Sequence, residues 1–471
     1  MRLIPLSLLF LMLVTFLTSC SNEAKERNLK EKFNQYTNQN QQVIFSGKIN
    51  IKDILQNADY QHIPKLNNLI SKEILEFNQG IHIDSGIYFS VEGLLDHEGN
   101  PLEVNVFATL KNKDSIQDKI ASLGLMLEHG KNLDYALGNS YGVGIQGNVV
   151  VFHFQKQGAI TQNQFSTIFQ RLNQVKALTI NNQSFTKGTV ELHTHIDHIY
   201  GLYKQKHAIS LDKIKLKEVE QLLKNATLTT TLTFEGGGIT IKTKHHFSES
   251  LKKRMIFDSH AANSLGSLAK GNVTLGVSMH LDPMKIQTLI EDFNPDFFED
   301  LGQTYGNIGF GMLALGNRPV SNLLGGQLTL LYYGEDNSHS AYIALGDEGK
   351  SISHLMHSFF STNPLYNLNI HEKAVVATSK THVISQQQLI LPVFANDFGT
   401  HGFDLFMDVT EYNSKQPVLV IEYPFLNVIS WVKITATNEG STIRIQGKDS
   451  EQGILKQVVD LYVEQIKKQF N

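Results

Sequence analysis

The chain has 471 residues, of which 41% are hydrophobic and 18% are charged. These values are typical of a globular protein and exclude a disordered or fibrous one. The formal net charge is −4 and no long basic or acidic run is present, so we expect no nucleic-acid partner. The single cysteine, Cys20, excludes an internal disulfide, and the fold must therefore rest on packing alone.

The N-terminus has the features of an export signal. A positive charge at Arg2 precedes an apolar stretch from Leu3 to about Leu17, which is shorter than the ~20 residues that a membrane-spanning helix needs. The run that ends at Cys20 resembles the lipobox of bacterial lipoproteins, in which the cysteine becomes the lipidated first residue of the mature chain. A chance cysteine behind an ordinary signal peptide is the alternative. We predict a signal peptide at 1–19 and lipidation of Cys20.

The residues after Cys20 predict the membrane to which the protein is sent and the character of the segment that precedes the folded part. Ser21, in place of Asp, is similar to the pattern that directs lipoproteins to the outer membrane. We therefore expect a lipid anchor in the outer membrane, and the sequence leaves open whether the folded part faces the periplasm or the outside. Residues 20–42 are polar and rich in Asn, Gln, Lys and Glu, which predicts a solvated tether.

Beyond the tether, strand patterns alternate with helix patterns. At ~150 residues per domain, we expect an N-terminal α+β domain at 43–185 and a C-terminal α+β region at 186–471, with a further division near residue 300 as an alternative. Period-2 patterns around turn residues predict four hairpins, and period-3.6 patterns predict two amphipathic helices. The hairpins lie at 139–155, 228–243, 327–345 and 432–446, and the helices at 165–172 and 454–462. This mixture predicts an α+β fold with antiparallel or mixed sheets and packed helices.

One strand-to-helix unit recurs along the chain. Segments 43–55, 190–202 and 273–289 each run from an apolar strand into a helix start. Their junctions carry Asn or Asp, which are preferred helix caps because the side-chain oxygen accepts from free backbone N–H groups. Pro283 follows the third junction at the first helical position, where its missing N–H is not needed. The three capping residues are Asn50, Asp197 and Asp282.

The sharpest chemical motif lies in the second unit. His193, His195, Asp197 and His198 match the H-x-H-x-D-H motif of the metallo-β-lactamase superfamily, and Gly201 follows three places later. The resemblance implies a hydrolase in which the first two histidines bind one metal, the Asp and last His serve a second, and a bridging hydroxide attacks the substrate. Zinc would be the expected metal.

The surroundings of this motif favour a structural role instead. The only upstream D-T-G-like turn, at 84–86, is far from the motif, and the chain has no Gly-His dipeptide. Asp197 is explained as a helix cap, while His193 and His195 share one face of a strand because side chains alternate with period 2. We therefore predict no catalytic residue and no metal, with the zinc site as the alternative. The downstream histidines without the expected neighbours are His245, His246, His260 and His280.

Other candidates are weaker. His354 and His357, at i and i+3, are best interpreted as surface histidines, because no carboxylate or further histidine completes a metal set. His245 and His246 are adjacent near the end of a strand and point to opposite faces. The glycines at 236–238 lie between two strand patterns and therefore predict a turn, not a phosphate loop.

The chain as a whole is similar to a family of Bacteroidetes lipoproteins that is classified only by a domain of unknown function. The likeness lies in the lipobox, the polar segment and patterns at 43–50, 85–90, 232–237 and 432–466. That family has no assigned catalytic residues to carry over. The resemblance implies a membrane-anchored envelope lipoprotein that binds or scaffolds an unknown ligand or envelope protein without being an enzyme. The alternative is a metallo-β-lactamase-like hydrolase centred on residues 193–198.

Overall fold

A computed structural model describes the chain in two compact units. Unit 1 comprises residues 1–208, 225–234 and 452–471, and unit 2 comprises 209–224 and 235–451. This division differs from the boundary expected near residue 186, because the strand that follows it pairs with the first strand of the chain. The described residues are 23–83, 86–96, 100–174, 188–206, 216–258, 265–293, 297, 318–349, 365–371, 373–383, 386, 388–415 and 422–470.

Unit 1 is built on one antiparallel sheet. Its strands follow the order β10, β9, β1, β3, β4, β8, β7, β6, β5, and β2 adds two further pairs to β4. The bounds are β1 Val43–Ile49, β2 Ile81–His82, β3 Ile87–Glu92, β4 Glu103–Leu110, β5 Glu128–His129, β6 Asp134–Leu137, β7 Tyr141–Gln146, β8 Val149–Gln155, β9 Val190–His195 and β10 Thr227–Glu235.

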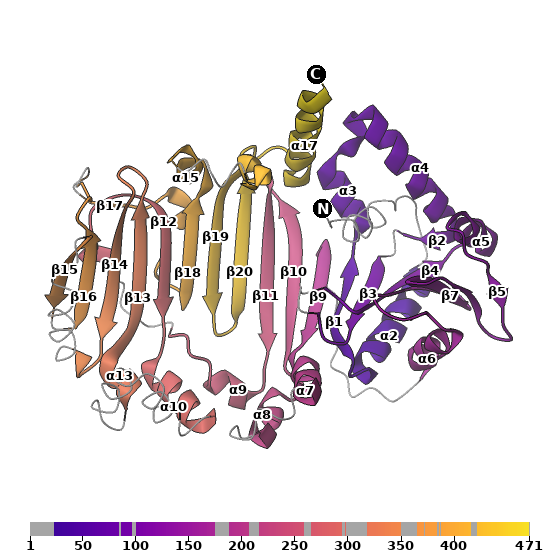
Figure 1. The fold of residues 1–471 in the computed structure, drawn as a ribbon, viewed down its shortest axis with the longest axis horizontal. Helices are drawn as coiled ribbons and strands as arrows, with labels where there is room; N and C mark the ends of the chain where they lie inside the picture. The colour runs from indigo at the N-terminus through magenta and orange to yellow at the C-terminus, as the bar shows by residue number, and fades with distance from the viewer. Residues whose placement is uncertain are drawn as a thin grey trace. The chain divides into compact units, whose positions relative to one another are not determined.

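Helices cover both faces of this sheet (Figure 1). Helices α2 and α6 contribute to one core with Tyr88 and Phe107 of the strands. Helices α3, α4 and α5 contribute to another core with Ile87 and Val143, which lie on the opposite face. The bounds are α2 Glu23–Gln39, α3 Ile51–Ala58, α4 Pro64–Gly80, α5 Lys113–Ser122, α6 Gln162–Asn173, α7 Ile196–Lys206 and α17 Ile454–Phe470.

Helix α2 corrects the expected tether. Residues 23–39 are helical, and Leu29, Phe33 and Tyr36 are buried against the sheet. The ring of Phe33 lies 5.1 Å from that of Tyr88 and 5.2 Å from that of Phe107. Spacings of four and three residues put these three side chains on one helix face, so a polar segment with a narrow apolar stripe becomes part of the core.

Unit 2 contains nine antiparallel strands in the order β15, β16, β14, β13, β12, β18, β19, β20, β11 (Figure 1). The short β17, Leu389–Ile390, pairs with β12 in parallel. The bounds are β11 Gly238–His246, β12 Gly271–His280, β13 Leu324–Tyr333, β14 Ser338–Leu345, β15 Tyr366–His371, β16 Ala374–Ser379, β18 Phe403–Asp408, β19 Ile429–Thr437 and β20 Gly440–Gly447. Its helices are α8 Leu216–Leu223, α9 Glu249–Lys253, α10 Pro283–Phe293, α13 Pro319–Leu323 and α15 Val409–Lys415.

The predicted α+β class is confirmed, with hairpins at β7–β8, β13–β14 and β19–β20. The strands predicted at 228–234 and 239–243 are β10 and β11, and both predicted helices form as α6 and α17. No helix in the described part of the chain is both long and apolar enough to cross a membrane.

All three strand-to-helix units exist, as β1–α3, β9–α7 and β12–α10. Asn50 caps α3 by accepting from Asp53 N, and Asp282 accepts from the backbone N–H groups of Met284 and Lys285. Asp197 differs, because it lies inside the first turn of α7. One carboxylate oxygen accepts from the N–H of His198 and the other from the N–H of Asn225, just before β10.

Candidate ligand cavity and histidine cluster

One face of the unit 1 sheet carries paired apolar side chains. Val91 of β3 lies opposite Val104 of β4, which lies opposite Phe154 of β8. Phe89, Val106 and Phe152 form a second such row. Because directly paired residues point to the same side of a sheet, these two rows make a continuous apolar surface.

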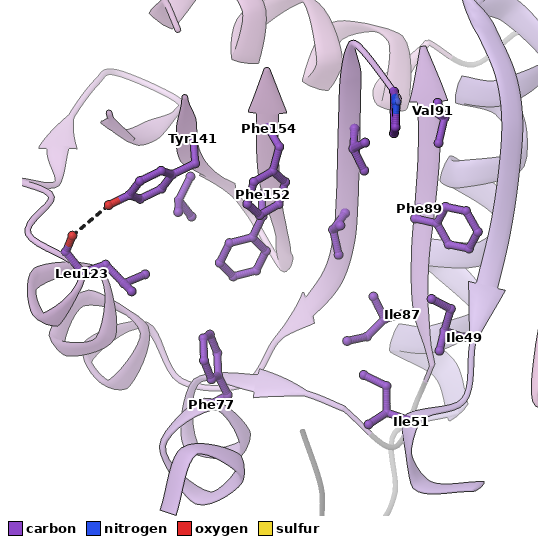
Figure 2. A pocket seen from close by; sticks show the side chains of 15 residues that line it. Ile49, Ile51, Phe77, Ile87, Phe89, Val91, Leu123, Tyr141, Phe152 and Phe154 are labelled. Atoms are coloured by element: carbon purple, nitrogen blue, oxygen red, sulfur yellow. Dashed lines mark hydrogen bonds between the residues drawn. The ribbon is translucent and has the colours of Figure 1, made fainter. Parts of the chain in front are cut away.

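This surface forms the floor of a cavity of about 220 Å³. Figure 2 shows Phe77 of α4 and Ile51 near one end, and Val91 and Phe154 near the other. Phe77 and Ile51 are buried, whereas Val91 and Phe154 are half-buried. It is lined by Ile49, Ile51, Phe77, Ile87, Phe89, Val91, Pro101, Val104, Val106, Leu123, Tyr141, Gly142, Val143, Phe152 and Phe154.

Local sequence explains part of this shape. Gly47 of β1 lies directly beside Phe89, and a Cβ at Gly47 would come within 2.6 Å of that ring. The glycine therefore leaves room for the Phe89 ring on the cavity floor. Across from the floor, Leu123 follows α5 and Pro101 precedes β4. The cavity is thus bounded by segments that are distant from one another in the sequence.

The lining offers almost no polar chemistry. Its only side-chain heteroatom is the Tyr141 hydroxyl, which donates a hydrogen bond to the Leu123 carbonyl at 3.0 Å (Figure 2). The Tyr141 hydroxyl already has a hydrogen-bond partner, so a ligand in the cavity would contact the aromatic ring. Because a buried polar ligand group without a partner costs about 1–3 kcal/mol in proteins, this lining selects apolar molecules.

A polar cluster lies on the opposite face of the same strands and fastens α2. The carboxylate of Glu92, only 7% exposed, accepts from the Tyr36 hydroxyl, from Asn40 Nδ2 at 2.9 Å and from Asn105 Nδ2 at 2.7 Å. Burial, and then the charge of Glu92, hold the pKa of Tyr36 well above its usual range. The carboxylate oxygens are occupied by these donors, which supports a structural role.

The structure places the histidines of β9 as the period-2 argument predicts. His193 and His195 are both buried on one face of the strand. His195 Nε2 lies 3.3 Å from Ser46 Oγ, and Thr229 Oγ1 lies 3.1 Å from His193 Nδ1. His198 donates from Nδ1 to the Val43 carbonyl at 2.7 Å. Each contact ties β9 or α7 to a neighbouring strand of unit 1.

Three of the four motif residues come together. Ligand atoms of His195, Asp197 and His198 lie within 4.8 Å of one another, and His193 is not part of that group. The His195 and His198 rings are stacked, with centroids 4.8 Å apart and planes at 9°. Because an imidazole lone pair lies in the ring plane, two nearly parallel rings do not converge on one ion at the usual ~2.0–2.1 Å. The three ligand atoms are thus close together while the two rings do not point at one position, and the absence of zinc stays a prediction.

The downstream histidines that the structure describes do not complete the set. His245 and His280 belong to unit 2, where His245 Nδ1 lies 3.2 Å from the Asn438 carbonyl and His280 Nε2 lies 3.2 Å from Ser278 Oγ. Neither of them, nor His246, belongs to the 195–198 group among the residues that the structure describes. Cys20, the turn candidate at 84–85, His260, His354 and His357 lie outside the described residues.

The burial of His195 predicts a pH dependence of stability. Burial, and then the charges of His198 and His193, lower the pKa of His195 from 6.5 to about 3. Between these values the unfolded chain binds a proton that the folded chain does not, so stability falls as the pH falls through this window and is unaffected above it. The loss is about 1.4 kcal/mol per pH unit, or about 2 kcal/mol between pH 6.5 and 5.

Urea unfolding at pH 7 and pH 5 measures this effect. We expect the unfolding free energy of His195→Gln to drop less between the two pH values than that of the wild type. An equal drop in both proteins would show that His195 titrates normally in the folded state.

Sequence reasoning missed the cavity. Its residues were visible only as alternating apolar positions, such as Ile87, Phe89 and Val91. Such alternation indicates a strand with a covered face, and it is the same whether a helix or an empty space lies above it. The signal that distinguishes the two cases is tertiary, because it depends on where Phe77 and Leu123 lie.

Comparisons with known proteins do not identify a family for this chain. No family model and no curated protein matches the chain. Among solved structures, crystal form III of TP0453 covers 45% of this chain and 80% of its own, at 10% identity and a TM-score of 0.25. Crystal form I covers 44% and 76% at 12% identity, with the same TM-score. A likeness at this level supports no conclusion about fold or function.

Proposed function

We propose that the protein is an outer-membrane lipoprotein, anchored through a diacylglycerol on Cys20, whose unit 1 binds a hydrocarbon chain. The observation that carries the binding role is the cavity on the unit 1 sheet, which is lined by apolar side chains and by Tyr141. The anchor rests on the lipobox-like run that ends at Cys20.

The size of the cavity suits part of an acyl chain. A dry cavity of about 150 Å³ accepts the six carbons of benzene. By proportion, the 220 Å³ cavity has room for roughly nine carbons. Burying each methylene contributes about 0.8 kcal/mol, which sums to roughly 7 kcal/mol before the costs of association. Affinities in the micromolar to millimolar range, which correspond to about 4–8 kcal/mol, are therefore expected.

The lining favours binding over catalysis. General acid–base or nucleophilic catalysis needs a positioned titratable group or an activated nucleophile within reach of the substrate. The Tyr141 hydroxyl, the only such group in the lining, donates a hydrogen bond to the Leu123 carbonyl. A ligand in this cavity would meet hydrocarbon and aromatic rings alone.

We also propose that the run from His193 to His198 is structural and that zinc is not a cofactor. Asp197→Ala should cost about 1–2 kcal/mol of stability, because the backbone N–H groups of His198 and Asn225 lose their acceptor. Asp197→Asn should cost about half as much, since one carbonyl oxygen remains. Added zinc should leave the melting temperature of the wild type unchanged. A rise with zinc that disappears in Asp197→Ala and His198→Ala would establish the metal site.

Removal of the lipid acceptor should release the protein. In Cys20→Ala no thiol remains to receive the diacylglycerol, so we expect the chain in the soluble fraction or as an uncleaved precursor. Ser19→Ala is a matched control, because it changes the neighbouring position and keeps the thiol. Fractionation of cells with immunodetection measures the result. Outer-membrane partitioning of Cys20→Ala equal to that of the wild type would contradict the lipid anchor.

Titration of the full chain with a fluorescent fatty acid tests the binding role. We expect saturable binding that an unlabelled fatty acid displaces and that a short polar carboxylate such as acetate does not. Acetate serves as the control because it carries the same head group without the chain. Fluorescence that rises without saturation would contradict a defined cavity.

A further inference from the structure

The unit 2 sheet has an apolar face whose central row is not buried by any part of the chain that the structure describes. Each of its nine strands contributes one residue that lies opposite a residue of the neighbouring strand, and together the nine residues form a single row across the sheet. The row runs from Leu368 on β15, through Val277 on the central β12, to Ile241 on β11. Every position in this row is apolar. A second row continues the pattern from Ile370 through Met279 to Ala436.

This face is accessible, whereas the other side of the same central strands is buried. None of the nine residues in the first row is buried, and Leu330 is 40% exposed. Ser278 and Thr329, the sequence neighbours of Val277 and Leu330, are 0% exposed on the opposite side. The central strands thus bury Ser278 and Thr329 together with Leu331 and Phe406 on one side, and leave the apolar first row only half-buried on the other. An ordinary solvent-facing side of an antiparallel sheet would be polar.

The size of the face corresponds to a protein interface. The first row crosses nine strands, the second seven and the third at least five. At ~4.8 Å between strands and ~6.8 Å between alternate residues, this gives roughly 700 Å². The third row includes Leu275, Met407 and Val432. A standard stable interface buries about 800 Å² on each partner. Exposed apolar patches of this size exceed what monomers usually carry and mark interaction sites.

We propose that this face docks against the same face of a second copy of the chain, sheet against sheet. Permanent homodimer interfaces are more apolar than those of transient partners and resemble a domain core cut in half. A sheet with one buried and one open apolar face is half of a sandwich in this sense, and two such sheets pack about 10 Å apart. The inference does not depend on ligand binding by unit 1.

The order of side-chain sizes in the first row supports a copy as the partner. A two-fold axis along β12 places β14 and β16 over β19 and β20 of the other copy. Ala341 then faces the strand that carries Ile434, and Ala377 faces the strand that carries Ile443. Leu330 faces the strand of the other copy that carries Leu405. Two of these strand pairs set Ala against Ile, which lets the two layers interdigitate there, and the pair of Leu330 and Leu405 brings two large side chains together beside the axis.

Single-cysteine cross-linking of the full chain in the cell envelope tests this proposal. Val277→Cys lies on the proposed axis, so two thiols should face each other, and a short bifunctional thiol reagent should give a dimer. Lys242→Cys is the matched control, because Lys242 is exposed on the opposite side of β11. We expect at least tenfold more dimer from Val277→Cys than from Lys242→Cys or from the wild type, whose only cysteine is Cys20.

A second change separates docking from chance collision. Leu330→Glu added to Val277→Cys should reduce the dimer yield at least tenfold, because the carboxylate would be buried in the apolar contact. Since Leu330 is 40% exposed in one copy, each copy of the variant should stay folded, which circular dichroism checks. Equal dimer yields from Val277→Cys and Lys242→Cys would overturn the proposal. Cross-linking of Val277→Cys to a different protein, or no cross-linking of it at all, would also overturn it. A monomer in which bound lipid shields the introduced thiol from the reagent would likewise overturn the proposal.

Discussion

Replacing Val106 by Glu is expected to weaken binding of a fluorescent fatty acid by unit 1 at least 100-fold. Val106 is half-buried in the cavity floor, between Phe89 and Phe152 in the sheet. A carboxylate there must either stay charged against hydrocarbon or take up a proton, and both cost free energy when an apolar chain fills the cavity. A 100-fold loss corresponds to about 2.7 kcal/mol, which lies within the range for a polar group buried without a partner.

Val106→Leu is the matched control for this prediction. It keeps the lining apolar and adds a single methylene, so its affinity should stay within about threefold of the wild type. Thermal melts of both variants show whether unit 1 remains folded. Full fatty-acid affinity in a folded Val106→Glu protein would place the ligand somewhere other than this cavity.

Loss of the Glu92 carboxylate is expected to have the largest effect on stability. In Glu92→Ala the Tyr36 hydroxyl and the amides of Asn40 and Asn105 lose their shared acceptor inside the protein. Each buried donor left without a partner costs about 1–3 kcal/mol, so we expect a total of about 4 kcal/mol by urea unfolding. Helix α2 should also become sensitive to protease, because this cluster fastens it to the sheet.

Two smaller changes calibrate this effect. Glu92→Gln keeps one acceptor oxygen and should cost about 2 kcal/mol, whereas Tyr36→Phe removes one donor and should cost about 1–2 kcal/mol. The double variant Glu92→Ala with Tyr36→Phe should be less destabilised than the sum of the two single changes, because the two residues share one hydrogen bond. Full additivity would show that the cluster does not act as a unit.

Local patterns in the sequence were sufficient for the hairpins, the helices α6 and α17 and the three strand-to-helix units. The turn around Gly147, which has φ of +60°, joins β7 and β8 as predicted from Gln146-Gly147-Asn148. Asn50 and Asp282 cap helices because a short polar side chain at a strand-to-helix junction acts within three residues. These features were predictable because their causes lie within a few residues of one another.

Features that depend on distant segments were not predictable in the same way. Leu29, Phe33 and Tyr36 stand in a polar stretch, and only the sheet face formed by Tyr88 and Phe107 makes them a core. The cavity arises because Phe77 and Leu123 bound a sheet floor without filling the space above it.

The histidine motif combines a feature that the sequence predicts with one that depends on distant segments. His193 and His195 share a strand face as the sequence indicated, yet the stacking of His195 on His198 depends on how α7 leaves β9. Asp197 was expected at the helix junction and instead bridges two backbone N–H groups from inside the first turn. Motif spacing therefore brought three possible ligand residues together and did not determine how the two histidine rings would be oriented.

The most direct test of hydrocarbon binding is photoaffinity mapping of the full chain with a diazirine-bearing fatty acid. After irradiation and digestion, we expect labelled peptides that contain Phe77, Val106 or Phe152, which line the cavity on three different elements. Excess unlabelled fatty acid should remove this labelling, and Val106→Glu should reduce it. Labelling that is spread evenly over both units, or that survives competition, would contradict the proposed function of the cavity.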